Sequence, residues 1–341
     1  MAETGTGSGS GAWTEPGVYE VAPGVHRIPL PLPNDNLRAV NVYAVDSGDG
    51  LVLVDSGWAL DEARSALESA LGTLGFGFED VRRFLVTHIH RDHYTLAVSL
   101  RRTFGSRIAL GAGEKPNLDL ITSGNLTSAF PDLRAWGAEP LAEPLRAAFR
   151  PSRRDRENFE PPDEWLAGTQ DVPVGGRTLR AVPTPGHTQG HVVFVDEAAS
   201  LLFAGDHVLP HITPSIGFEP VRGRRPLGDY LDSLRLMAKY PDLRLLPAHG
   251  PVGGRLHARV DELLAHHEDR LGETGDAVRA GAATAYDAAR RITWTRRRRG
   301  FDDLDLFNQM LAVGETAAHL DVLVERGELT MAVTDGVAYY A

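Results

Sequence analysis

The sequence of 341 residues contains no cysteine and no long apolar run. Without cysteine the chain has neither disulfide bonds nor thiolate metal ligands, and its composition leaves the redox compartment open. No apolar run approaches the roughly 20 residues that cross a bilayer, and Met1–Trp13 lacks the basic and apolar parts of a signal peptide. We therefore expect residues 1–15 to be a flexible tail of a cytoplasmic protein without a membrane partner.

Positive charge is also scarce, because 35 Lys and Arg stand against 46 Asp and Glu, a formal net charge of −11. Nucleic acids and anionic membranes attract proteins through basic surface, so this balance argues against a generic affinity for either. The length is sufficient for one large domain plus a small one.

What the sequence does contain is a cluster of metal-binding side chains directly after an apolar run. Phe84-Leu85-Val86 is typical of a buried strand, and Thr87–Tyr94 follows it with the side chains of His88, His90, Asp92 and His93. Burying four polar groups costs a few kcal/mol each unless they have partners, and a metal ion would satisfy all of them. Imidazole and carboxylate suit zinc, with iron or manganese as alternatives.

Four further motifs accompany this cluster along the chain: Val54-Asp55-Ser56-Gly57, Thr184-Pro185-Gly186-His187, Gly205-Asp206 and Pro247-Ala248-His249-Gly250. Together the five motifs resemble the metallo-β-lactamase superfamily of binuclear metal hydrolases, with a ligand set like that of glyoxalase II. The resemblance covers roughly residues 20–255. It implies an α/β fold of the αββα type, in which two mixed sheets are flanked by helices, for a catalytic domain of residues 16–255. It is less specific for substrate, because one fold hosts many reactions.

The resemblance also assigns the metal ligands. It implies that His88, His90 and His187 hold one Zn²⁺ ion, that Asp92, His93 and His249 hold a second, and that Asp206 bridges the two. His207 is the less favoured neighbour, because adjacent residues of an extended chain point to opposite sides.

The chemistry implied by the resemblance is hydrolysis by a water that the two cations activate. Asp92 is the expected catalytic residue, which would orient this water and pass its proton to the leaving group. Asp55 is expected to brace the metal loops from outside the ligand set, and His191 to have a structural hydrogen-bonding role.

Hydrophobic patterns place these motifs at the ends of strands. Helices are predicted at Ala59–Leu74, Thr95–Phe104 and Tyr230–Ala238, between strands that include Val40–Val45, Leu51–Asp55, Arg83–Val86, Arg177–Val182, Ser200–Ala204 and Arg244–Pro247. The alternation of strand and helix indicates helices layered on sheets.

Two segments are candidates for the substrate pocket. Residues 111–170 form a proline-rich insertion, the expected place for a substrate lid or wall, and its arginines 150, 153, 154 and 156 would either receive an anionic group or form a solvated face. The apolar loop 208–218 offers Ile212, Ile216 and Phe218 as substrate-binding residues. Core packing is the preferred interpretation of Tyr94, and the substrate-binding alternatives are that it shapes the pocket floor or donates to an oxyanion.

The C-terminal part, residues 256–341, shows helical patterns at Leu256–Thr274, Asp276–Trp294 and Leu304–Arg326, then a hairpin signal around Asp335-Gly336. This order resembles the small winged-helix domain of some superfamily hydrolases. Such a domain and the run Arg296–Arg299 suggest nucleic acid. However, ten arginines stand against fifteen acidic residues in this part, which favours packing or homodimerisation. We expect the run to be paired with Asp302, Asp303 and Asp305.

Three functions remain open at this point. Hydrolysis of a small thioester, ester or lactone is favoured, because the apolar loop and the aromatic insertion would line a mostly apolar pocket. A phosphodiesterase or ribonuclease of the same superfamily is supported only by the winged-helix-like end. A non-catalytic metal-binding interaction protein is opposed by the complete ligand set.

Overall fold

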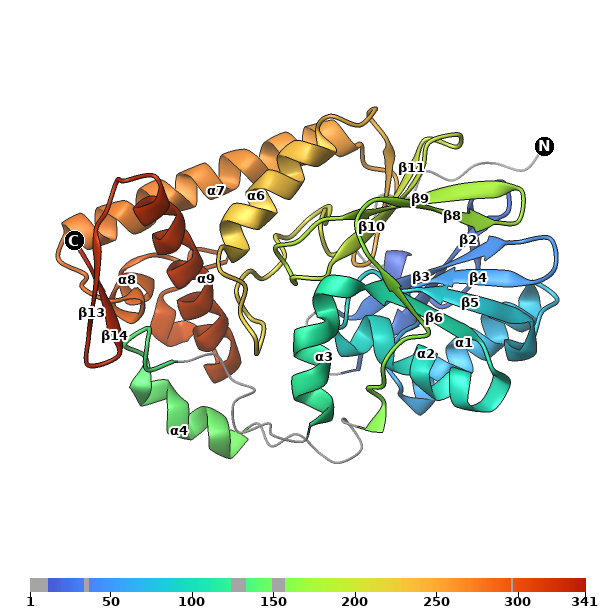
Figure 1. Ribbon diagram of the computed structural model, residues 1–341, viewed down its shortest axis with the longest axis horizontal. Helices are drawn as coiled ribbons and strands as arrows, with labels where there is room; N and C mark the ends of the chain where they lie inside the picture. The colour runs from blue at the N-terminus through green and yellow to red at the C-terminus, as the bar shows by residue number, and fades with distance from the viewer. Residues whose placement is uncertain (1–11, 34–36, 124–132, 149–156, 296) are drawn as a thin grey trace.

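The computed structural model describes residues 12–33, 37–123, 133–148, 157–295 and 297–341. In these residues two mixed β-sheets pack face to face between helices, and further helices lie beside this sandwich, at the left of Figure 1. The predicted αββα architecture is confirmed. Within the described residues, none of the helices combines the length and the hydrophobicity that a bilayer crossing requires.

The first sheet has seven strands within the described residues, ordered as in the chain: β1 (Tyr19–Ala22), β2 (Val25–Pro31), β3 (Ala39–Asp46), β4 (Leu51–Val54), β5 (Val81–Leu85), β6 (Arg107–Gly111) and β7 (Glu164–Leu166). β1 to β4 are antiparallel neighbours, whereas β4 to β7 run parallel. Because β4 and β5 are parallel, the segments that begin at Asp55 and Thr87 leave the same edge of the sheet.

The second sheet has the order β12-β11-β10-β9-β8, with β8 (Gln170–Val174), β9 (Arg177–Pro183), β10 (Val192–Asp196), β11 (Leu201–Gly205) and β12 (Arg244–Pro247). β11 and β12 are parallel, and the other neighbours are antiparallel. β9, β11 and β12 therefore run in one direction, and each ends just before a predicted ligand motif.

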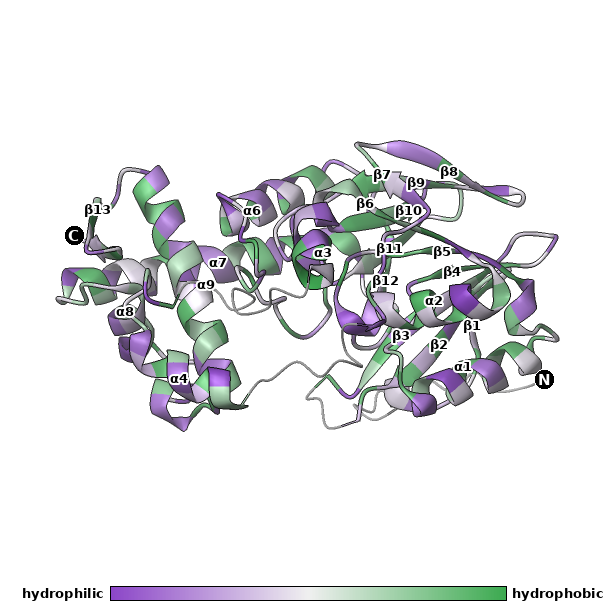
Figure 2. Cartoon of the chain, turned by 60° about the horizontal axis from the view of Figure 1, so that its bottom comes forward, coloured by the Kyte–Doolittle hydropathy of each residue, from purple (hydrophilic) through white to green (hydrophobic). Residues whose placement is uncertain are grey.

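Among the described residues, three hydrophobic cores hold the layers together. Between the sheets, the rings of Tyr43 and Phe203 meet edge to face with centroids 5.5 Å apart. On the outer face of the first sheet lie α1 (Asp61–Thr73) and α2 (Arg91–Phe104), and α1 buries Ala63, Leu67, Ala70 and Leu71 at helical spacing. In Figure 2 the strands of this sheet are mostly green, whereas α1 turns purple residues outward.

The third core joins the second sheet to the C-terminal helices. α6 (Pro226–Met237) and α7 (Leu256–Arg279) cover the sheet, and α8 (Ala285–Arg291) and α9 (Leu306–Glu325) extend the same core. The proposed domain boundary at residue 255 precedes α7, but the core continues across it.

The insertion divides between the two parts of the molecule. α3 (Lys115–Thr122) and β7 belong to the sandwich, whereas α4 (Glu139–Ala148) buries Leu141 and Leu145 in the core of the C-terminal helices. The arginines at 150, 153, 154 and 156 lie outside the described residues, as does most of the predicted tail. Short 3-10 turns occur at Ala12–Thr14, Phe78–Asp80, Ala112–Glu114 and Phe301–Asp303.

The predicted C-terminal hairpin is confirmed. β13 (Met331–Thr334) pairs with β14 (Val337–Tyr340), and the two-residue turn between them has φ values of 50° at Asp335 and 81° at Gly336. Both values are positive, as the tight hairpin turn with these residues requires. Three helices followed by a hairpin is the order that motivated the winged-helix interpretation, which stays a prediction.

Several boundaries and pairings differ from expectation. α2 begins at Arg91 instead of Thr95, so Asp92 and His93 lie in its first turn, and the segment predicted as helix from Asp276 to Trp294 is divided between the end of α7 and the short α8. The predicted pairing of the arginine run is wrong for its described members. Asp302 pairs with Arg290 at 3.4 Å, Asp303 accepts from the Gly300 N–H, and Asp305 caps α9.

Candidate metal centre

The predicted ligands come together where the strands of both sheets end. The segment after β5 supplies His88, His90, Asp92 and His93, and the loops after β9, β11 and β12 supply His187, Asp206 and His249. Residues from 88 to 249 thus converge because parallel strands place their carboxyl ends at one edge.

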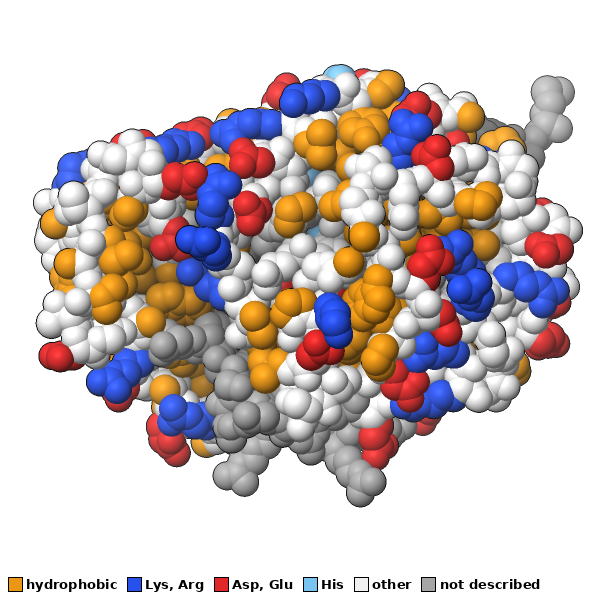
Figure 3. All heavy atoms as spheres, viewed as in Figure 1, with side chains coloured by type: hydrophobic (Ala, Val, Ile, Leu, Met, Phe, Trp, Pro, Cys, Tyr) orange, Lys and Arg blue, Asp and Glu red, His pale blue; other side chains and the backbone are white. Residues whose placement is uncertain are grey.

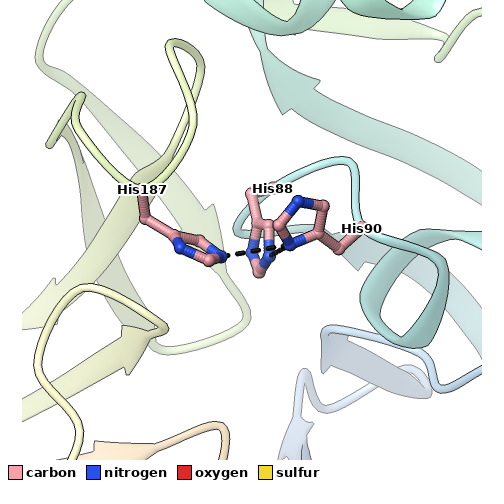
Figure 4. A group of neighbouring side chains, drawn as sticks. All are labelled: His88, His90 and His187. Carbon is pink, nitrogen blue, oxygen red and sulfur yellow. Dashed lines mark hydrogen bonds between the residues drawn. The ribbon is translucent and has the colours of Figure 1, made fainter. Parts of the chain in front are cut away.

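Three imidazoles form the first ligand group. His88 Nε2 lies 2.9 Å from His90 Nδ1, and His187 Nε2 lies 3.1 Å from the same atom. Figure 4 shows the three rings pointing toward one another from two different loops. Their ligand atoms all lie within 4.8 Å of one another, a spacing that a single ion can bridge.

The second ligand group consists of Asp92, His93 and His249. Asp92 Oδ2 lies 3.5 Å from His93 Nε2 and 3.4 Å from His249 Nε2. The side chain of Asp92 is 14% exposed, whereas His93 is fully buried. Asp92 is therefore the ligand of this group that a substrate or water can reach.

Asp206 connects the two groups with its two oxygens. Oδ2 lies 3.5 Å from His187 Nε2 in the first group, and Oδ1 lies 3.4 Å from His249 Nε2 and 3.8 Å from His93 Nε2 in the second. This placement is the one expected of a bridging carboxylate.

Hydrogen bonds outside the ligand set fix the orientation of the rings. His93 Nδ1 lies 2.9 Å from Asp55 Oδ2, and the Nδ1 atoms of His187 and His249 lie 2.8 Å from the carbonyl oxygens of Ser215 and Ala39. Because Nδ1 of each ring is held from behind, Nε2 faces the centre.

Asp55 adopts a conformation that is uncommon for a residue with a side chain, with φ of 62°. Its carboxylate accepts the N–H of Thr87 at 2.8 Å and the hydroxyl of the same residue. Strain of this kind persists where the surroundings fix it, commonly at functional sites. The structure thus places Asp55 where the sequence predicted a brace for the metal loops.

The donor atoms fit a pair of metal ions. Among the described residues, His93 Nε2, Asp206 Oδ1 and His249 Nε2 are buried and have no hydrogen-bond partner. An unpartnered buried polar atom costs about 1–3 kcal/mol, so three of them in one place call for an outside partner. Imidazole nitrogens and carboxylate oxygens are ligands that Zn²⁺, iron and manganese accept.

Electrostatics differ between the two groups. Burial lowers the pKa of His88, His90 and His187, that of His90 to about 3, so these rings are neutral and can ligate. Burial also lowers the pKa of His93, but Asp55 and Asp92 outweigh it and raise that pKa to about 10. Burial raises the pKa of Asp92, yet His93 and His249 hold it below its ordinary range. In the second group a bound metal cation would take the place of the protons that the raised pKa keeps on the imidazole of His93.

His191 lies beside the ligands without joining their set. Its Nδ1 is 2.8 Å from the Thr184 hydroxyl, and its Nε2 accepts the N–H of Asp206 at 3.1 Å. These contacts agree with the hydrogen-bonding role proposed for it.

The four predicted substrate-binding residues differ in burial and in packing partners. Tyr94 is fully buried and its hydroxyl donates to the Glu160 carbonyl, which favours the packing interpretation. Ile216 is also in the core, Phe218 packs against Phe307 of α9 with centroids 5.4 Å apart, and Ile212 is 42% exposed. Within this loop the contact with a ligand is made by the Ser215 carbonyl.

Sequence reasoning missed two supporting residues. Asn41 is fully buried and donates to the carbonyls of Pro247 and Gly250, on both sides of His249. Glu114 is fully buried between the loops of the first ligand group. The available signals were a lone polar residue inside the apolar strand β3 and a Gly-Ala-Gly-Glu run after β6.

Comparisons with known proteins agree with this geometry. The sequence profile of the Metallo-beta-lactamase superfamily matches residues 35–249. The chain is 27% identical over 276 residues to Lactamase-like protein nscB of Aspergillus fumigatus. The aligned region covers 76% of this chain and 67% of that protein. The chain is also 27% identical over 245 residues to Atrochrysone carboxyl ACP thioesterase of the same fungus. The aligned region covers 71% of this chain but only 45% of that protein.

Two crystal structures resemble the whole chain. A metallo-beta-lactamase family protein from Thermus thermophilus has a TM-score of 0.74 and 28% identity, and covers 94% of this chain and 99% of that one. A Beta-lactamase domain protein from Burkholderia ambifaria has a TM-score of 0.77 and 30% identity, and covers 95% and 94%. The similarity therefore includes the C-terminal helices.

Proposed function

Because the chain belongs to the metallo-β-lactamase superfamily and is a hydrolase of that fold, we propose that it cleaves the thioester bond of a small acyl compound with two Zn²⁺ ions. The observation that carries the hydrolytic part is the position of Asp206. One of its oxygens faces the three-histidine group and the other faces His93 and His249. Iron or manganese are the alternative metals.

In this proposal His88, His90 and His187 hold one ion, and Asp92, His93 and His249 hold the other. When bound, the two ions lower the pKa of a water and polarise the carbonyl of the substrate. The remaining steps belong to side chains of the chain itself. Asp206 keeps the two ligand groups in register, while Asp55 and the carbonyls of Ser215 and Ala39 keep the rings aimed.

Asp92 is the residue that handles the proton. Its side chain is the partly exposed member of the second group, so a water on the substrate side can approach it. As the water oxygen bonds to the acyl carbon, Asp92 accepts the water's proton, and the proton then passes to the departing sulfur. The carbon–sulfur bond breaks, and the products are a carboxylic acid and a thiol.

The leaving group is the reason for preferring a thioester to an ester. The pKa of Asp92 is held below its ordinary range by its histidine neighbours, so this side chain stays ionised and little of its protonated form is present to act as an acid toward the leaving group. A thiol has a pKa of about 8.5, so a thiolate departs without a strong acid. The similarity to a protein named as an ACP thioesterase also supports this choice.

The proposal is tested with the metal-loaded enzyme and a panel of an acyl thioester, the matched oxygen ester, a lactone, a β-lactam, a phosphodiester and a short RNA. We expect kcat/KM to be highest for the thioester and to fall by about a thousandfold in Asp206→Ala. Faster cleavage of the RNA or the phosphodiester would replace the proposal with the ribonuclease alternative. On the face seen in Figure 3, blue and red side chains are interspersed and form no continuous basic track, which supports a small-molecule substrate.

A further inference from the structure

Glu114 is a fully buried acid that belongs to neither ligand group. It ends the 3-10 turn Ala112–Glu114 after β6. Its Oε1 accepts the Ile89 N–H at 3.3 Å and the Thr188 hydroxyl at 2.5 Å. Ile89 lies between His88 and His90, and Thr188 follows His187. One carboxylate oxygen therefore touches both loops that carry the three rings of Figure 4.

The backbone of the turn that carries Glu114 also meets the His187 loop directly. A side-chain carbon at Gly113 would collide with the Gln189 carbonyl, and one at Gly190 would collide with the Glu114 N–H. Only glycine allows this approach, because the backbone at Gln189 and Gly190 cannot move aside without moving the loop that carries His187. The contact joins the first half of the sandwich to the second half two residues after His187.

A second buried acid continues the contact on the far side of Glu114. Glu219 accepts the N–H of Gln189 at 3.0 Å and the side-chain amide of Asn117 at 2.7 Å. Burial raises the pKa of Glu114 to about 7 and, together with the charge of Glu114, that of Glu219 to about 9. Uncharged forms are thus accessible near neutral pH, which makes glutamine a close replacement for Glu114.

We propose that Glu114 is a positioning residue that fixes the spacing of the His88–His90 and His187 loops, and thereby sets the metal affinity of the three-histidine group selectively. The second group depends on other supports, because Asp55 holds His93 and the Ala39 carbonyl holds His249. The inference rests on the proposed binuclear function.

The test compares three variants with the wild type. Glu114→Leu removes both acceptor oxygens, whereas Glu114→Gln keeps one carbonyl oxygen for Ile89 and Thr188. Thr188→Val removes the hydroxyl donor with little change in shape. It takes the place of Glu114→Leu in the test if that variant does not fold. Asp196→Leu is the matched control, because Asp196 is an equally buried acid (1% exposed) that pairs with Arg177 away from the ligand loops.

The principal readout is the binding of zinc measured by competition with a chromophoric chelator. We expect Glu114→Leu to bind one of its two ions about 10- to 100-fold more weakly, the range seen when partners of metal ligands are removed. Affinity for the other ion should be unchanged. Glu114→Gln should restore both affinities, and Asp196→Leu should bind two ions like the wild type even if it melts earlier.

Absorption spectra of the cobalt-loaded proteins identify which ion is weakened. The spectrum of Glu114→Leu should resemble that of His187→Ala, which damages the first group, and differ from that of His249→Ala. The inference is overturned if Glu114→Leu or Thr188→Val keeps both affinities, or if the second group is the one weakened. A wild-type protein that binds a single ion would instead refute the binuclear function itself.

Discussion

At the metal-side edge of the sandwich, His93 Nε2, Asp206 Oδ1 and His249 Nε2 are buried and have no hydrogen-bond partner among the described residues. At the opposite ends of the second sheet's strands, Arg177 pairs with Asp196 at 2.9 Å and Arg180 pairs with Glu197 at 2.7 Å. Both edges are rich in ionisable side chains, but the four charged side chains of the second edge are hydrogen-bonded in pairs, whereas the three metal-side atoms make no hydrogen bond within the described residues.

The difference separates a binding site from a structural charge cluster. Removing one partner of a buried hydrogen bond costs about 1–3 kcal/mol, so unpartnered donor and acceptor atoms that face one another indicate an external group that completes them. Asp196 has such a completed environment, because it also accepts the Ala199 N–H at 2.9 Å. Asp206 does not. Substitutions at these two aspartates therefore test the comparison directly.

The largest effect is expected for Asp206→Ala. Both ligand groups lose a shared carboxylate, and a loss of several kcal/mol of transition-state stabilisation lowers kcat/KM by about a thousandfold. Asp196→Ala should leave kcat/KM for the thioester unchanged, although the unpaired Arg177 lowers the melting temperature. Steady-state kinetics of the two variants measure kcat/KM, and thermal melts measure the melting temperature. Equal losses of activity in the two variants would contradict the claim that only the metal-side edge is a functional site.

His207 provides a stricter control for the same site. It adjoins Asp206 and is fully buried, but its ring lies 5.3 Å from that of Tyr230, in an edge-to-face contact. His207→Ala should therefore lower stability more than metal content. If its zinc stoichiometry fell as far as that of Asp206→Ala, the bridging ligand would have been misassigned.

Removal of the metal is expected to have the next largest effect. A ligand at 100 times its Kd stabilises the folded state by about 2.7 kcal/mol, which is several degrees in melting temperature. Chelated wild-type protein should thus melt earlier and recover with added zinc. The zinc-dependent shift should persist in Asp196→Ala and be mostly lost in Asp206→Ala. A shift of equal size in both aspartate variants would show that zinc acts elsewhere.

The convergence of the candidate ligands could be predicted from the sequence because each follows a strand within a short motif, so local signals also fix the geometry. The residues that hold the ligand loops in place could not be predicted, because the groups they contact are remote in the chain. Asn41 holds carbonyls 206 and 209 residues away, and Glu114 contacts Thr188 across 74 residues. No local pattern encodes such distances.

The apolar loop 208–218 was harder still, because apolar residues suit a pocket wall and a core equally. Ile216 and Phe218 proved to pack into or against the C-terminal helices. Arg259 of α7 also holds the loop, since its side chain donates to the carbonyls of Leu209 and Ile212. Which apolar side chains remain for a substrate thus depends on tertiary packing.

A smaller effect is expected from Asp55→Asn. Asparagine tolerates the left-handed conformation of residue 55, so the backbone should be preserved. The carboxylate behind His93 is lost, which should weaken metal binding by about 10- to 100-fold at the second group. Zinc competition and cobalt spectra provide the measurement, with His249→Ala as the spectroscopic reference. Weakening confined to the three-histidine group would contradict the assignment of the two sites.

The smallest effect is expected at Arg297, Arg298 and Arg299, which are exposed and make no ion pair in the described part of the chain. Unlike the atoms at the metal-side edge, these side chains have solvent as their partner, so the lack of a protein partner does not indicate a site. Replacing all three by glutamine should change stability by no more than about 0.5 kcal/mol per substitution and leave thioester turnover unchanged. The same variant should be assayed with short RNA at several salt concentrations, because phosphate contacts weaken as salt rises. Loss of a salt-sensitive RNA cleavage in this variant would show that the exposed run is functional, and the thioesterase proposal would give way to the ribonuclease.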